Sequence, residues 1–179
     1  FVALQVQRTM LKHGTRLSVL GASGVAVSIY AIHVKRQKMK LHDGYVALCD
    51  SETFSCSQVL TSEYSALLSH LNLVGKASIL NVSNAHLGVL AYSLFPLYPV
   101  VRKMPYHAQF YTAVSSCMVV AMVYLAYILA FVLRDFCIVC VATYVITGAL
   151  LWSSLNLWQA LATRRARIYG TIYITCSYK

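Results

Sequence analysis

The residues best suited to chemistry in this sequence are its cysteines, because four of the six form two pairs. Cys137 and Cys140 make a C-x-x-C motif, whereas six residues separate Cys49 from Cys56. Side chains three residues apart on a helix share one face, so Cys137 and Cys140 can bond to each other or share one reaction. Asp135 is suited to cap a helix that begins here, and a helix N-terminus lowers the pKa of a thiol. The motif therefore predicts thiol–disulfide exchange.

The elements that must position these thiols are membrane helices. Hydrophobic residues make up 59% of the 179 residues and charged residues only 11%, whereas an ordinary soluble domain is about 25% charged. This composition excludes a soluble globular domain and a disordered segment. Four apolar stretches are long enough to cross a bilayer. They predict a single all-α domain over 1–179, a polytopic membrane four-helix bundle with spans at about 14–34, 84–101, 108–133 and 136–160 and a loop at about 35–83.

The charges indicate how this bundle is oriented. Short connections at residues 102–103 and 134–135 make neighbouring spans antiparallel, so both termini lie on one side. That side holds nine of the 15 Lys and Arg residues and none of the five acids. Because Lys and Arg gather on the cytoplasmic side of membrane proteins, we expect cytosolic termini and a lumenal loop. The net charge of +10 is then an orientation signal, and we expect no nucleic-acid partner.

The first apolar stretch has a second interpretation, a cleaved signal peptide. Arg8, Lys12 and Arg16 would form its basic flank. We favour an uncleaved span, because the apolar run is long and no small-x-small site follows it. The chain begins with Phe1 rather than Met, so we expect residues to precede it.

Two structural alternatives remain open for the cysteine pairs. They can form structural disulfides in an oxidising compartment, or four thiols can bind zinc. The pairs differ in spacing, however, and no nearby His completes the usual zinc pattern. A C-x-x-C beside a second pair in a membrane bundle favours an electron relay, whose acceptor would be a hydrophobic quinone. We expect Cys117 to be a small buried hydrophobe within a span and assign no role to Cys176.

At these residues the chain resembles the vitamin K epoxide reductase family. The segment 135–140, followed by Thr143 and Tyr144, carries the most specific part of the resemblance. The other parts are 28–34, 47–50, 55–57, 79–81 and 83–84, and the whole resemblance runs from 17 to 158. It implies a four-helix fold in the endoplasmic reticulum membrane. It also implies reduction of vitamin K 2,3-epoxide to the quinone and of the quinone to the hydroquinone.

The resemblance implies roles for the two cysteine pairs. Cys137 and Cys140 are the active-site pair, in which Cys140 contacts the substrate and Cys137 resolves. Cys49 and Cys56 relay electrons, and Cys56 exchanges with Cys137. A lumenal thioredoxin-like oxidoreductase supplies the electrons, and coumarin-type anticoagulants are ligands of the family. We expect no metal and no tightly bound cofactor, with vitamin K quinone or epoxide as substrate.

The resemblance also implies a substrate pocket. Asn84 and Tyr144 would donate hydrogen bonds to the quinone oxygens, and uncharged donors of this kind stabilise a developing oxyanion. The alternatives are a helix cap for Asn84 and a packed core aromatic for Tyr144. The remaining expected substrate-binding residues are Leu60, Tyr64, Leu87 and Tyr92.

The chain departs from the family pattern at three places. The loop pair is one residue closer together than the family spacing. Leu60 and Tyr64 stand where the family has Phe and Trp in the cap over the substrate, and Leu87 and Ala91 stand where it has two Phe of the pocket wall. Smaller side chains predict a looser fit to the naphthoquinone ring and to its inhibitors.

Two other functions compete with epoxide reduction. The same parts could run in reverse, as a quinone-coupled disulfide-forming enzyme that oxidises thioredoxin-like partners, because relative potentials set the direction. The chain could instead be a non-enzymatic four-span scaffold with a disulfide-braced loop.

Overall fold

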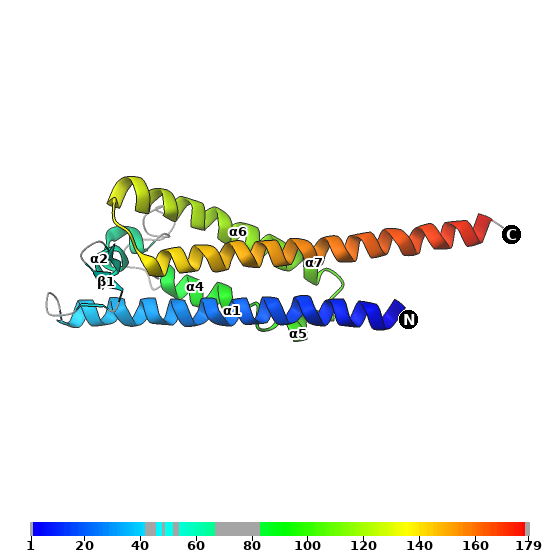
Figure 1. Ribbon diagram of the computed structural model, residues 1–179, viewed down its shortest axis with the longest axis horizontal. Helices are drawn as coiled ribbons and strands as arrows, with labels where there is room; N and C mark the ends of the chain where they lie inside the picture. Colours follow the sequence, from blue (N-terminus) through cyan, green and yellow to red (C-terminus); the bar gives the residue numbers. More distant parts are fainter. Residues whose placement is uncertain (1, 42–45, 48, 52–53, 67–82, 178–179) are drawn as a thin grey trace.

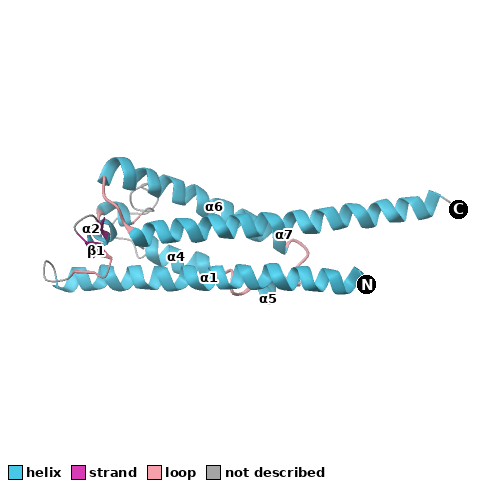
Figure 2. Cartoon of the chain, in the orientation of Figure 1, coloured by secondary structure: helices cyan, strands magenta, loops and turns pink. Residues whose placement is uncertain are grey.

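The computed structural model describes all residues except 1, 42–45, 48, 52–53, 67–82 and 178–179. The long helices are α1 (Val2–Leu41), α6 (His107–Tyr127), continued by the π-helix η3 (Ile128–Leu133), and α7 (Ile138–Ser177). The short elements are β1 (Asp50–Ser51), β2 (Phe54–Ser55), α2 (Cys56–Thr61), the 3-10 helix η2 (Glu63–Ser65), α4 (Asn84–Ser93) and α5 (Tyr98–Val101). The all-α prediction is confirmed, with one small hairpin added (Figure 2).

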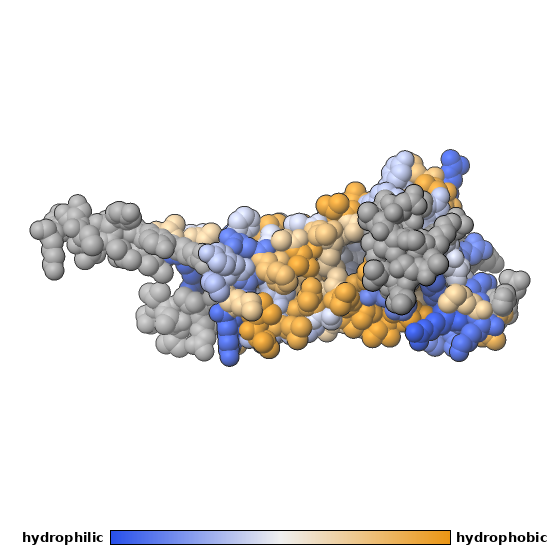
Figure 3. Space-filling model, turned by 180° about the vertical axis from the view of Figure 1, so that it is seen from behind, coloured by the Kyte–Doolittle hydropathy of each residue, from blue (hydrophilic) through white to orange (hydrophobic). Residues whose placement is uncertain are grey.

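Three helices are long and apolar enough to cross a membrane, and they cover Leu11–Leu41, His107–Leu133 and Ile138–Arg164. They overlap three of the predicted spans, although α1 and α7 continue well beyond 14–34 and 136–160. Hydrophobic residues gather over the middle of the bundle face in Figure 3, and hydrophilic residues gather toward its ends. The chain is an all-α membrane protein.

The predicted span at 84–101 is interrupted. It consists of α4 and α5, joined by turns in which Leu94 N–H donates to Ala91 O and Tyr98 N–H to Phe95 O. Pro96 lies within this joint, where it has no N–H to donate and disfavours helical geometry at the residue before it. Both short helices lie along α1 and complete the bundle (Figure 1).

Glycines let α1 approach α4 closely. A Cβ atom at Gly24 would lie 2.5 Å from Cδ1 of Tyr92, and one at Gly21 would lie 2.5 Å from Cβ of Phe95. Small residues at helix interfaces commonly permit such contact in membranes. The core beneath this contact includes the buried side chains of Leu17, Tyr92, Phe95, Tyr98, Tyr111, Leu150 and Leu157.

The chain reverses between η3 and α7 over residues 134–137. Arg134 has a φ of 53°, a left-handed conformation of the kind that often ends a helix. This reversal returns α7 along α6, so Cys137 lies at the same end of the bundle as the hairpin and α2. Both termini lie at the opposite end (Figure 1), as the antiparallel prediction requires.

Candidate active site

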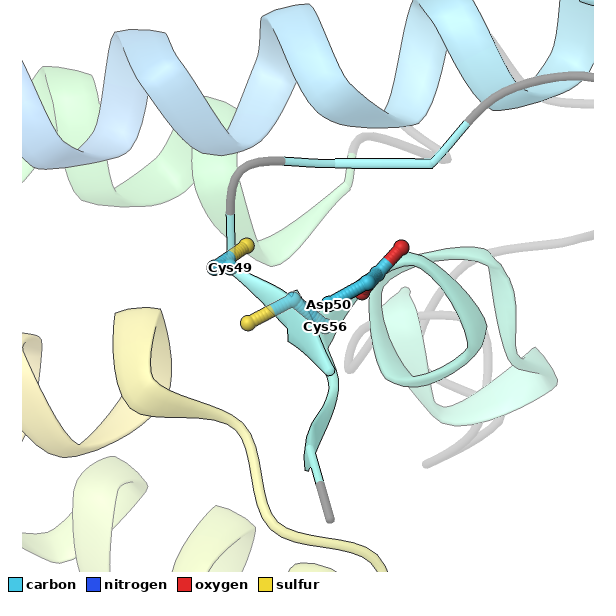
Figure 4. Close-up of side chains that lie close together, drawn as sticks. All are labelled: Cys49, Asp50 and Cys56. Atoms are coloured by element: carbon cyan, nitrogen blue, oxygen red, sulfur yellow. The ribbon is translucent and has the colours of Figure 1, made fainter. Parts of the chain in front are cut away.

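The hairpin brings the two loop cysteines together. Asp50 pairs with Ser55 and Ser51 with Phe54, so the same antiparallel register places Cys49 opposite Cys56. The three side chains that matter here, those of Cys49, Asp50 and Cys56, appear in Figure 4. The short spacing between the cysteines therefore still places them as a pair.

Asp50 fixes the geometry of this hairpin. Its Oδ1 accepts the Ser57 N–H at 2.9 Å, at the first turn of α2, and its Oδ2 accepts the Ala47 N–H at 3.0 Å. The carboxylate thus caps α2 from the neighbouring strand and holds the Cys49 turn beside Cys56. Burial opposes ionisation of Asp50, but the bonds from Ser57 and Ala47 outweigh it and lower the pKa of the carboxyl group.

The central contact of the site joins the loop to α7. Cys137 Sγ lies 3.5 Å from Cys56 Sγ, and both side chains are fully buried. Both are free thiols in this structure, as are Cys49 and Cys140. A disulfide needs an S–S distance of about 2.05 Å, so a small movement joins the two sulfurs. The predicted exchange between Cys56 and Cys137 is therefore geometrically direct.

The start of α7 differs from the prediction. Cys137 O accepts the Val141 N–H at 3.1 Å, and Cys137 Sγ accepts the Cys140 N–H at 3.4 Å. These are the two bonds of an N-cap residue, so Cys137 caps the helix and the prediction of Asp135 was wrong. The sequence favoured Asp135 because a carboxylate is the commoner cap. The helix begins two residues later than expected and uses the thiol instead.

The loop thiols are poor nucleophiles at rest. Burial, with the neighbouring Cys56, raises the pKa of Cys49 to about 12, although a hydrogen bond from Tyr30 opposes the rise. Burial also raises the pKa of the Cys56 thiol. Since only the thiolate reacts, exchange at this pair requires a proton acceptor or a catalytic partner.

Cys140 opens onto an apolar cavity of about 300 Å³. All six residues expected to bind substrate line this cavity, namely Asn84, Tyr144, Leu60, Tyr64, Leu87 and Tyr92. Ala91 and Cys117 line it as well. Cys117 was expected to be buried, and that prediction was wrong, because its side chain is exposed on α6. Cys140 thus joins a buried thiol chain to a mainly apolar chamber that suits a hydrophobic ligand.

Two wall residues are held by hydrogen bonds. Asn84 Nδ2 donates to the Tyr64 carbonyl at 2.9 Å. This bond ties α4 to residues 59–65, the segment that covers the cavity. The helix cap of α4 is Ser83, so the alternative reading of Asn84 as that cap was wrong. The Tyr92 hydroxyl contacts Thr147 Oγ1 at 2.6 Å and donates to Thr143 O at 3.2 Å. These bonds fix the cavity wall between α4 and α7.

Two further residues of α1 reach the site, and sequence reasoning gave neither a role. The Tyr30 hydroxyl donates to Cys49 Sγ at 3.9 Å. Lys35 Nζ donates to Ser65 Oγ at 2.7 Å and so ties α1 to η2. Both lie in or next to the 28–34 segment of the resemblance, but their partners are 19 and 30 residues away. Only the packing of the loop on α1 reveals these contacts.

Comparison with known proteins agrees with this geometry. Residues 16–155 match the vitamin K epoxide reductase family. The chain is 42% identical over 134 residues to "Vitamin K epoxide reductase complex subunit 1" of Mus musculus. The aligned region covers 72% of this chain and 80% of the relative. The rat (Rattus norvegicus) protein of the same name gives the same identity and coverage. With four thiols at one end of a membrane bundle and a match over most of its length, the chain belongs to the vitamin K epoxide reductase family.

Proposed function

We propose that this protein is a thiol-dependent membrane oxidoreductase that reduces vitamin K 2,3-epoxide to the quinone and the quinone to the hydroquinone. One observation carries the proposal: Cys56 and Cys137 lie 3.5 Å apart, and Cys140, one turn further on, lines the apolar cavity. Electrons can therefore pass from a water-facing loop to a lipid-soluble acceptor through adjacent sulfurs. The names of the mouse and rat relatives support the epoxide as substrate.

The first half of the proposed cycle moves two electrons inward. An external dithiol reduces the Cys49–Cys56 disulfide and is itself oxidised. The Cys56 thiolate then attacks Cys137 of the Cys137–Cys140 disulfide, which releases the Cys140 thiolate and forms a Cys56–Cys137 disulfide. Attack by Cys49 on Cys56 restores the loop disulfide and frees Cys137. Each exchange breaks one S–S bond and forms one, and the central one uses the contact between Cys56 and Cys137.

The second half reduces the substrate. The Cys140 thiolate attacks an epoxide carbon, the C–O bond breaks, and the oxygen takes up a proton. Cys137 then attacks Cys140 Sγ, which forms the disulfide and expels the carbon as an enolate, and loss of water yields the quinone. Quinone reduction consumes a second pair of thiols and two protons are taken up by the hydroquinone oxygens. In this proposal Tyr144 and Asn84 donate hydrogen bonds to the two oxygens, where uncharged donors in an apolar cavity stabilise the anions that form.

The cavity supports a ring-shaped ligand held by few polar groups. Leu60 and Tyr64 belong to the covering segment, and Leu87 and Tyr92 belong to the wall. The bonds from Lys35 to Ser65 and from Asn84 to Tyr64 hold the cover in place. We propose that coumarin-type anticoagulants enter this cavity. We further propose that their affinity is low, because the small side chains of Leu87 and Ala91 offer a bound ring few packing contacts.

We also propose where the enzyme works and what supplies its electrons. In the endoplasmic reticulum membrane, cytosolic termini would place the hairpin and Cys49 on the lumenal side. A thioredoxin-like lumenal oxidoreductase could then reach the half-buried Cys49. No tightly bound cofactor is needed, because thiols supply all the electrons of the cycle.

The test compares epoxide and quinone reduction by wild type and by the single Ala variants of Cys49, Cys56, Cys137 and Cys140. Each protein is driven first by dithiothreitol and then by a reduced thioredoxin-like protein. We expect loss of Cys137 or Cys140 to abolish turnover with both reductants. Loss of Cys49 should spare much of the dithiothreitol reaction, because a small thiol bypasses the loop, and should abolish the protein-driven reaction.

A lipid-facing control is Tyr127→Phe, since Tyr127 is exposed on α6 and lies apart from the cavity. It should retain full turnover. Equal activity of the wild type and all four Cys→Ala variants would refute the mechanism. If wild type yielded no quinone from epoxide but oxidised the thioredoxin-like protein when quinone was present, the reverse, disulfide-forming direction would be the correct one.

A further inference from the structure

The hairpin that carries the relay thiols also carries a third metal-ligating group. Cys49 Sγ, Cys56 Sγ and a carboxylate oxygen of Asp50 all lie within 4.8 Å of one another (Figure 4). We propose that, when both thiols are reduced, these three side chains bind a thiophilic divalent cation such as zinc. This site is distinct from the Cys137–Cys140 pair and from the apolar cavity.

The spacing of the ligand atoms suits such an ion after a small contraction. Zinc binds sulfur at about 2.3 Å and carboxylate oxygen at about 2.0–2.2 Å, so tetrahedral ligands lie roughly 3.5–3.8 Å apart. The three atoms are at most 4.8 Å apart, so each needs to move by about 1 Å or less toward a common centre. Cys49 lies in a turn and is only half-buried, which leaves an approach for the ion. The fourth coordination position remains for water.

The carboxylate is prepared for this role. The amides of Ser57 and Ala47 each donate to one of its oxygens, so the carboxylate is held in place beside the two sulfurs. Each carboxylate oxygen has two lone pairs, so one remains for a metal. Carboxylates that ligate metals are commonly hydrogen-bonded in this way. Lys38 interacts electrostatically with Asp50 and offsets part of the negative charge that two thiolates would add.

Binding is linked to the redox state of the pair. The cation displaces the protons of two thiols, which pass to solvent, and no electron moves. A Cys49–Cys56 disulfide offers no thiolate, so only the reduced loop binds. Cys56 Sγ is also the atom 3.5 Å from Cys137 Sγ, so a bound cation withdraws it from exchange. That consequence rests on the proposed function, whereas the binding itself does not.

Cobalt(II) tests the binding directly. The full chain in detergent is reduced with a phosphine, desalted without oxygen and titrated with Co²⁺. We expect one ion per chain, with a thiolate-to-cobalt charge-transfer band that zinc displaces. Cys49→Ala and Cys56→Ala should lose the band, as should the oxidised wild type. Asp50→Asn should weaken binding on the order of tenfold or more. Cys117→Ala, which removes an exposed thiol on α6, should keep the spectrum.

Absence of the charge-transfer band from reduced wild type would overturn the proposal. So would an undiminished band in Cys49→Ala, because the ligands would then lie elsewhere. A second measurement follows the consequence for electron transfer. Fully reduced, metal-free enzyme without added reductant should convert two epoxide molecules per chain, one for each thiol pair. With zinc bound, the enzyme should convert one epoxide molecule per chain, because the loop pair cannot pass its electrons to Cys137. No conversion without metal would contradict the proposed function and leave the cobalt result standing.

Discussion

Cys49 lies opposite Cys56 because Asp50 pairs with Ser55 in the hairpin between them. The hairpin is short, with the pairs Asp50–Ser55 and Ser51–Phe54, and the Asp50 carboxylate stabilises it by capping α2. As a result the loop pair lies next to the pair on α7, since Cys56 Sγ lies 3.5 Å from Cys137 Sγ.

The first prediction concerns which cysteines can pair across the site. In the double variant Cys49→Ala/Cys140→Ala, Cys56 and Cys137 remain as neighbours 3.5 Å apart without their usual partners. We expect them to form a disulfide on mild oxidation, which peptide mass spectrometry under non-reducing conditions detects. The matched variant Cys56→Ala/Cys140→Ala leaves Cys49 with Cys137 and should yield little of that disulfide. Equal cross-linking in both variants would show that the loop moves freely.

A second prediction concerns Tyr30, whose hydroxyl donates to Cys49 Sγ at 3.9 Å. In the proposed cycle the reductant forms a mixed disulfide with Cys49, and this bond stabilises the Cys49 thiolate that leaves when the reductant's second thiol resolves that mixed disulfide. Tyr30→Phe should slow reduction of the Cys49–Cys56 pair by a protein reductant about fivefold, the equivalent of roughly 1 kcal/mol. Stopped-flow measurement of loop reduction gives this rate. Tyr127→Phe is the control, and an unchanged rate in Tyr30→Phe would exclude the role.

The third prediction follows from the high pKa of Cys49. Burial raises that pKa to about 12, so the thiolate fraction grows about tenfold per pH unit from pH 7 to pH 10. Iodoacetamide labelling of Cys49 in reduced protein with a metal chelator, followed by mass spectrometry, should rise in parallel without a plateau. A free thiol should level off near its ordinary pKa of about 8.5. A plateau for Cys49 below pH 9 would contradict the buried, proton-retaining environment.

The last prediction concerns the contact between α1 and α4. Gly24→Ala places a Cβ 2.5 Å from Cδ1 of Tyr92, so we expect overpacking to destabilise the fold by about 1–3 kcal/mol. A thermal unfolding series in detergent measures this loss. At Gly148, nothing lies within 4 Å of an added Cβ, so Gly148→Ala should be neutral or stabilising through helix propensity. Similar melting temperatures for both variants would contradict the close approach.

Composition and charge predicted the class of fold because the bilayer imposes strong rules on apolar length. The third span, expected at 108–133, is His107–Leu133 in the structure, and the termini share one end. The break near Pro96 was missed because hydropathy measures apolar length and ignores the missing N–H of proline. A closer reading of Pro96 and Pro99 could have found it.

The site was predictable in its residue types and less so in its contacts. The C-x-x-C motif indicated exchange chemistry, and the family resemblance supplied the cavity residues, which the structure gathers around Cys140. The N-cap of α7 and the bond from Tyr30 to Cys49 depend on how segments far apart in sequence pack. Sequence spacing carries no information about such contacts. Asn84 shows the same limit, because its bond to the Tyr64 carbonyl crosses 20 residues.

The cap at the start of α7 links electron transfer to the local stability of a helix. Cys137 Sγ accepts the Cys140 N–H, and in the proposed cycle it is also the atom that approaches Cys56 to form the transient disulfide. Losing a capping bond costs a helix end about 1 kcal/mol. We expect the first turn of α7 to loosen when the Cys56–Cys137 disulfide forms. It should become ordered again when that disulfide breaks and Cys137 is free. The amide hydrogen of Cys140 would then exchange with solvent faster in the trapped intermediate, which makes it a built-in reporter of the relay.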